Sequence, residues 1–122
     1  MAAKVTTIVF DAAEPARLGQ FWSDVLGWER KAIEGPTDWV AVGDKNRETP
    51  FILLFLPTKS PKSVKNRVHI DLNPVGCDQL SELDRLLALG ARHVNVGQGE
   101  QPWVVLADPE GNEFCLLERR LD

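Results

Sequence analysis

The alternation of apolar and polar residues predicts short strands interrupted by one amphipathic helix in each half of the chain. In the first half, the helix begins near Pro15, a residue that suits the first helical position because its missing N–H would be unpaired there. Gly27 is placed to end this helix in a left-handed conformation. The apolar face of the helix consists of Leu18, Phe21, Trp22 and Val25. Strands are predicted at residues 4–10, 28–33, 38–42 and 51–56.

The second half repeats the same order of elements. Its predicted helix spans about 78–89, and its predicted strands are 67–72, 92–96, 101–107 and 113–118. Leu26-Gly27 and Leu89-Gly90, which end the two helices, are 63 residues apart, and the two segments containing Trp39 and Trp103 are 64 apart. The pattern therefore predicts an α+β protein of two tandem βαβββ modules within a single domain, residues 1–122.

The predicted modules span about 4–56 and 67–118, and a lysine-rich linker at about 57–66 joins them. We interpret its basic stretch as solvated, and the alternative is that it attracts an anionic ligand toward the cleft mouth; the stretch consists of Lys59, Lys62, Lys65 and Arg67. Each module is too small to bury a good core alone. Its helix would cover one face of its sheet, and the other module or a second chain would cover the other face. We therefore expect a curved, partly closed sheet around a cleft, and clefts between modules are common sites for small ligands.

Alternation along the strands predicts which side chains face this cleft. Ile8 and Phe10 should pack under the first helix, and Ile70 and Leu72 under the second. The tryptophans at 28, 39 and 103 are candidates for an aromatic wall, with sheet packing as the alternative. The residues predicted to line the cleft and bind the ligand are Thr7, Val9, Trp28, Trp39, Leu53, Phe55, Trp103, Cys115 and Leu117, together with His69 and Asp71.

Composition narrows the function. With 14 basic and 18 acidic residues, the net charge is −4, which weighs against a general nucleic-acid-binding surface. The longest apolar run, residues 51–56, is far short of the roughly 20 residues that span a bilayer. With no signal-peptide pattern, we expect a cytoplasmic protein without a membrane partner. The only cysteines, Cys77 and Cys115, cannot form a disulfide scaffold and should be reduced there.

Three segments carry a resemblance to a known family. They are Glu14–Leu18 with Phe21-Trp22 and Leu26–Trp28, the strand Val68–Leu72, and the ending Trp103–Cys115. Together with the repeat, they resemble the vicinal oxygen chelate superfamily, which includes glyoxalase I and bleomycin-resistance proteins, and in particular its glyoxalase-like domain branch. The resemblance covers nearly the whole chain and implies a homodimer, since relatives often complete their clefts across a subunit interface.

Metal-using members of that superfamily place ligands on four strands. Carried over to this chain, these positions fall at Thr7, Leu53, His69 and Cys115. Only His69 is a usual ligand, and a catalytic zinc site needs about three. We therefore expect no metal and no other cofactor.

His69 and Asp71 are the candidates for chemistry. Histidine changes charge near neutral pH, and Asp71 could orient its imidazole for general acid–base catalysis. A simple structural His69–Asp71 pair is the alternative. Cys115 is expected to be a buried filler rather than a nucleophile.

An apolar cleft is enough for binding, whereas catalysis needs a tuned titrating group. We therefore expect a small-molecule-binding protein whose ligand is aromatic or partly apolar. A metal-independent lyase, isomerase or hydrolase is the first alternative, and a metal-dependent glyoxalase or dioxygenase is the second.

Overall fold

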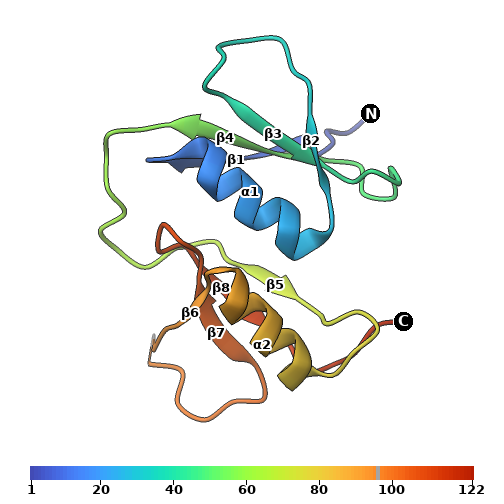
Figure 1. The fold of residues 1–122 in the computed structure, drawn as a ribbon, viewed down its shortest axis with the longest axis vertical. Coiled ribbons are helices and arrows are strands. Elements are labelled where there is room, and N and C mark those ends of the chain that lie inside the picture. The colour runs from blue at the N-terminus through green and yellow to red at the C-terminus, as the bar shows by residue number, and fades with distance from the viewer. Residues whose placement is uncertain (96) are drawn as a thin grey trace. The chain divides into compact units, whose positions relative to one another are not determined.

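The computed structural model describes residues 1–95 and 97–122 and divides into two compact units, residues 1–61 and 62–122. Each unit contains one helix and a four-stranded mixed sheet, in the order strand, helix and three strands (Figure 1). The prediction of an α+β fold built from two βαβββ modules is confirmed. Partial closure of the sheet around a cleft stays a prediction, as do the module boundaries near residues 56 and 67.

Unit 1 places its first and last strands side by side. The strand order in its sheet is β1-β4-β3-β2, with β1 parallel to β4 and the other pairs antiparallel. All four strands were predicted, but β2 and β3 are shorter than the apolar pattern suggested. The elements are β1 (Thr7–Ala12), α1 (Pro15–Leu26), β2 (Glu29–Lys31), β3 (Val40–Gly43) and β4 (Ile52–Pro57).

The core of unit 1 lies between α1 and its sheet. Trp22 of the helix is only 1% exposed, and its ring centroid lies 5.8 Å from that of Phe10 on β1. Phe10 also contacts Phe55 on β4, at 5.0 Å between centroids. The helix lies so close to the sheet that a Cβ added at Gly19 would be 2.6 Å from Cγ1 of Val40. Phe10 therefore packs under the helix, as predicted.

This packing shows that the predicted orientation of Leu53 and Phe55 is wrong. In the parallel pairing of β1 with β4, Ile8 is opposite Leu53 and Phe10 is opposite Phe55. Paired residues share a face of the sheet, so both β4 side chains lie on the face covered by the helix. Each is at most 2% exposed. On β4, the opposite face carries Leu54 and its alternates instead.

Unit 2 has the same topology, with strand order β5-β8-β7-β6 and β5 parallel to β8. The strands begin later or end earlier than predicted because backbone pairing covers only part of each apolar pattern. Val96, the end of a predicted strand, lies outside the described residues. The elements are β5 (Ile70–Leu72), α2 (Gln79–Leu89), β6 (Arg92–His93), β7 (Val104–Ala107) and β8 (Glu113–Leu116).

Helix α2 is held by polar contacts at its N-terminal end and by a buried leucine farther along. The side chain of Asp78 caps its N-terminus by accepting a hydrogen bond from the Ser81 N–H at 2.8 Å. The amide of Gln79 donates to the carbonyl of Leu116, where β8 ends, at 3.2 Å. Along the helix, Leu86 is fully buried, whereas Leu80 is 70% exposed. The helix is therefore tied to the sheet by both polar and apolar contacts.

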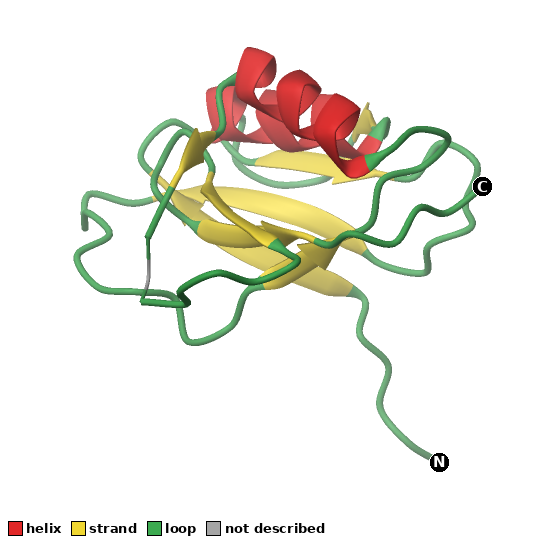
Figure 2. Cartoon of the chain, turned by 90° about the horizontal axis from the view of Figure 1, so that it is seen from below, coloured by secondary structure: helices red, strands yellow, loops and turns green. Residues whose placement is uncertain are grey.

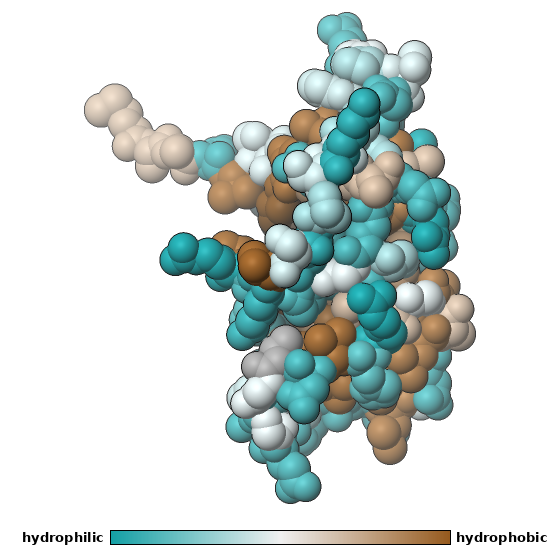
Figure 3. All heavy atoms as spheres, turned by 90° about the vertical axis from the view of Figure 1, so that its left-hand side faces the viewer, coloured by the Kyte–Doolittle hydropathy of each residue, from teal (hydrophilic) through white to brown (hydrophobic). Residues whose placement is uncertain are grey.

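The predicted linker is partly fixed to the units rather than wholly solvated. At one end, the Thr58 N–H donates to the carbonyl of Ala12 on β1 at 2.9 Å. At the other end, Lys62 and the Asn66 N–H both bind the carboxylate of Glu113 on β8. The segment lies on the left-hand side of Figure 1. Figure 3 shows that side from the front, and most of the residues visible on it are hydrophilic.

The six residues before β1 are exposed, and Figure 2 shows this N-terminal stretch leading away from the strands. Among residues 1–95 and 97–122, no helix is long and apolar enough to cross a membrane.

Candidate functional site

A pocket of about 310 Å³ opens on the sheet of unit 2. It brings together five of the predicted site residues from three different parts of the sequence. The described residues that line it are Lys65, His69, Asp71, Gln98, Trp103, Val105, Glu113, Cys115 and Leu117.

The strand register explains why these side chains meet. Asp71 on β5 is paired with Cys115 on β8, which is paired in turn with Val105 on β7. Paired residues point to the same side of a sheet, so these three side chains form a row across the floor of the pocket. Alternation adds Trp103, two residues before Val105, and His69, two residues before Asp71, to the same face. The face of Trp103, which its sequence pattern left open, is thereby settled.

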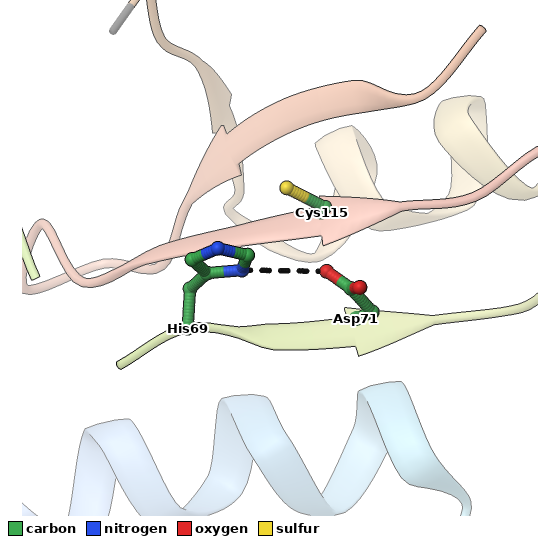
Figure 4. A group of neighbouring side chains, drawn as sticks. All are labelled: His69, Asp71 and Cys115. Atoms are coloured by element: carbon green, nitrogen blue, oxygen red, sulfur yellow. Dashed lines mark ion pairs between the residues drawn. The ribbon is translucent and has the colours of Figure 1, made fainter. Parts of the chain in front are cut away.

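His69 and Asp71 form a direct pair at the pocket. The Nδ1 atom of His69 lies 3.3 Å from Oδ1 of Asp71, and each side chain is 49% exposed (Figure 4). This distance marks an ion-pair contact and is longer than the roughly 2.7–2.9 Å typical of a charge-assisted hydrogen bond. The contact holds the imidazole beside the carboxylate through Nδ1, and Nε2 takes no part in it.

Cys115 lies beside this pair but is not activated by it. Burial raises the pKa of the Cys115 thiol, and the negative charge of Asp71 and a hydrogen bond to its carboxylate raise it further. The positive charge of Lys65 only partly opposes these effects. A nucleophilic cysteine needs a lowered pKa and exposure, and this side chain is 8% exposed. These properties favour a protonated Cys115 thiol that fills space in the sheet rather than acting as a nucleophile.

Glu113 is a pocket residue that the sequence pattern did not single out. Its Oε1 accepts hydrogen bonds from Nζ of Lys62 and from the Asn66 N–H, each at 2.9 Å. Its Oε2 lies 2.6 Å from the same Nζ as an ion pair, but without the geometry of a second hydrogen bond. Burial acts to raise the pKa of Glu113, yet the two donors and the charge of Lys62 together lower it below its usual value.

Lys65 and Gln98 are two further pocket residues that were not among the predicted site residues. The lysine belongs to the basic stretch that we interpreted as a solvated linker. Its place at the pocket depends on the path of residues 62–66 along unit 2, which the contacts to Glu113 fix. Hydrophobic periodicity does not reveal such a polar anchor.

The residues of this chain do not fit the four-strand metal centre of the superfamily. His69, Asp71 and Cys115 do hold donor atoms within 4.8 Å of one another. In unit 1, however, Leu53 is turned to the helix-covered face, and Leu54, which the strand pairing places as the counterpart of Cys115, is also apolar. The remaining unit 1 position, Thr7, offers only a hydroxyl group, which is a poor ligand.

The other predicted site residues lie in unit 1. Thr7 and Val9 alternate along β1 with Ile8 and Phe10, which face the helix. They therefore lie on the sheet face opposite α1, and Val9 is 49% exposed. Trp28 packs edge-on against Phe51, with 6.1 Å between ring centroids. The Trp39 indole lies next to the turn at Gly35, whose added Cβ would be 3.4 Å from the ring. Their part in ligand binding stays a prediction.

Residues 7–117 match the family described as the glyoxalase-like domain, which is nearly the whole chain. The chain belongs to the glyoxalase-like domain family. This confirms the resemblance that the repeat and the three sequence segments indicated. A search of curated proteins finds no significant match to the sequence.

Solved structures show the same fold. TnmS3, described as an antibiotic binding protein from Streptomyces sp. CB03234, is 18% identical, with a TM-score of 0.60 over 99% of this chain and 98% of its own. A glyoxalase/bleomycin resistance protein/dioxygenase family enzyme from Burkholderia phytofirmans PsJN is 18% identical, with a TM-score of 0.64 over 93% and 97%. The fosfomycin resistance protein FosX from Mesorhizobium loti is 11% identical, with a TM-score of 0.64 over 95% and 90%.

Proposed function

We propose that this glyoxalase-like protein binds a small, partly apolar molecule in the pocket of unit 2 without a catalytic metal. The observation that carries this proposal is the division of the pocket into two chemically different sides. Trp103, Val105 and Leu117 supply an apolar wall, and His69 and Asp71 supply polar groups. Ligand sites are commonly built in this way, with an apolar lining and a few polar groups that fix orientation.

The volume of the pocket and the fold shared with an antibiotic binding protein support the same proposal. The volume of about 310 Å³ lies at the lower end of the roughly 300–1,000 Å³ typical of ligand pockets, which suits a compound of one or two rings. The indole of Trp103 is 37% exposed, so a planar ligand can stack on it. The description of TnmS3, which has this fold, as an antibiotic binding protein supports such a role.

Tryptophan fluorescence tests the proposal directly. Small aromatic compounds are titrated into the wild-type protein and into Trp103→Phe, with Trp28→Phe as the matched control. Trp28 packs against Phe51 in unit 1 and does not line this pocket. A binding compound should quench the wild type and Trp28→Phe, and the quenching should largely disappear in Trp103→Phe. Equal quenching of all three proteins would place the ligand elsewhere and contradict the proposal.

The His69–Asp71 pair favours one second candidate, a metal-independent acid–base reaction on the bound molecule. The carboxylate orients the imidazole so that Nε2 can take a proton from a ligand O–H or C–H group. His69→Gln should then abolish turnover of a compound identified by fluorescence while changing its affinity only modestly. Loss of affinity without any turnover in the wild type would leave binding as the function.

A further inference from the structure

We propose that the ligand of this pocket is an organic anion, held with its apolar body against Trp103 and its anionic group against Lys65. This inference rests on the proposed binding function and adds the chemical class of the ligand. It follows from how the charged groups around the pocket are already paired.

The two carboxylates at the pocket have their own donors. Glu113 is 8% exposed and is neutralised by the ammonium group of Lys62, with the Asn66 N–H as a further donor. Asp71 lies 3.3 Å from Nδ1 of the His69 imidazole and has the Cys115 thiol as a donor. Both carboxylates therefore have partners within the protein, although Oε2 of Glu113 has no hydrogen bond beside its ion pair with Lys62.

Lys65 differs from these groups because it has no such partner. Among the described residues, none forms an ion pair or hydrogen bond with its ammonium group, and the residue is exposed. Its charge nevertheless reaches into the pocket, since it acts to lower the pKa of the Cys115 thiol. Lys65 thus lines the pocket as a cation without an ion-pair partner among the described residues.

The arrangement suits one anionic group joined to an apolar body. Trp103, Val105 and Leu117 can bury a ring, while Lys65 can bind a carboxylate, phenolate or phosphate on its edge. A neutral ligand of the same shape would keep the apolar contacts and lose the charge-assisted one. The pocket should therefore discriminate between an acid and its uncharged analogue.

The probes are 2-naphthoate and its uncharged isostere 2-naphthamide, titrated by isothermal calorimetry into the wild type, Lys65→Gln and Lys65→Arg. Lys59→Gln is the matched control, because Lys59 is an exposed lysine of the same segment that does not line the pocket. Circular dichroism confirms that each variant is folded.

We expect the wild type to bind the acid about tenfold more tightly than the amide, the size of one charge-assisted hydrogen bond. Lys65→Gln should abolish this difference by weakening the acid alone, and both Lys65→Arg and Lys59→Gln should retain it. Equal affinity of acid and amide for the wild type, or a preference that survives in Lys65→Gln, would overturn the inference and leave the binding function intact. Failure of both probes to bind would count against the binding function itself, and the inference would fail with it.

Discussion

Replacing Glu113 with glutamine tests whether one ion pair holds the segment 62–66 to unit 2. The change keeps the size of the side chain and a carbonyl oxygen for the Asn66 N–H, but removes the charge that binds Lys62. Removing one partner of a buried ion pair typically costs about 3–5 kcal/mol when the other charge stays buried. The side chain of Lys62 is 23% exposed and can regain water, so we expect the smaller loss of about 1.5–3 kcal/mol that suits a charge-assisted hydrogen bond.

The loss should depend on pH, because the pKa of Glu113 is lowered in the folded protein. A group with a lowered folded-state pKa stabilises the protein above its unfolded-state pKa, which is about 4.3 for glutamate. That contribution disappears as the pH falls through the folded-state pKa. Wild type and Glu113→Gln should therefore differ most near pH 7 and converge below pH 4.

Urea denaturation followed by circular dichroism, at steps from pH 7 to pH 3, measures this difference. Glu118→Gln is the control, because Glu118 is exposed and lies beyond the same strand. It should change stability by less than about 0.5 kcal/mol at any pH. The reasoning would be refuted if Glu113→Gln were as stable as the wild type at pH 7, or if its loss of stability persisted unchanged at pH 3.

Three further predictions concern packing and the cysteines. Gly19→Ala should destabilise the protein by about 1–2 kcal/mol in thermal or urea unfolding, because the added methyl group clashes with Val40. This cost outweighs the gain in helix propensity of about 1 kcal/mol. A variant more stable than the wild type would contradict the close approach of helix and sheet. Asp108→Ala should lower the free energy of unfolding by about 2–4 kcal/mol in the same assay, because the buried carboxylate accepts hydrogen bonds from the N–H groups of Glu110 and Asn112. A loss below about 0.5 kcal/mol would contradict this role. Iodoacetamide at pH 8 should modify Cys77 well before Cys115, whose pKa burial raises, and mass spectrometry of tryptic peptides would reveal the opposite order.

The sequence predicts the elements well where a local signal marks them. Pro15 and Gly27 bracket α1 as expected, and Asp78 and Gly90 bracket α2. Strand ends are less well predicted, because apolar alternation continues beyond the residues that actually pair. The predicted strand at residues 28–33, for example, is paired only at Glu29–Lys31.

The orientation of Leu53 and Phe55 shows how a small error in register reverses a prediction. The prediction took Leu53 and Phe55 as the repeat counterparts of Cys115 and Leu117, which is an offset of 62 residues. The strand pairing gives an offset of 61, because Ile8 pairs with Leu53 and Ile70 pairs with Phe114. A shift of one residue moves every side chain of a strand to the other face. The offset of 62 does hold for β1 and β5, so the predicted faces of His69 and Asp71 agree with the pocket.

The polar residues that line the pocket could be predicted only in part. His69 and Asp71 were predictable because they alternate with apolar residues on one strand. Glu113 was not, because its role depends on a contact with Lys62 that spans 51 positions. Lys65 was marked by the sequence only as part of a basic stretch that we interpreted as solvated. A single long-range ion pair leaves no periodic pattern in the sequence.

The parallel pairing of β5 with β8 also determines when the pocket can be assembled. Ile70 finds its partner 44 residues later in the chain, at Phe114, and β5 is an outer strand of its sheet with β8 as its one neighbour there. Closing so long a loop costs entropy that local hairpins avoid, so the β7–β8 hairpin should form before β5 docks. During synthesis, the strand that carries Asp71, with His69 just before it, must therefore wait until β8 has left the ribosome. Its amide protons should also be among the first in the sheet to exchange with solvent.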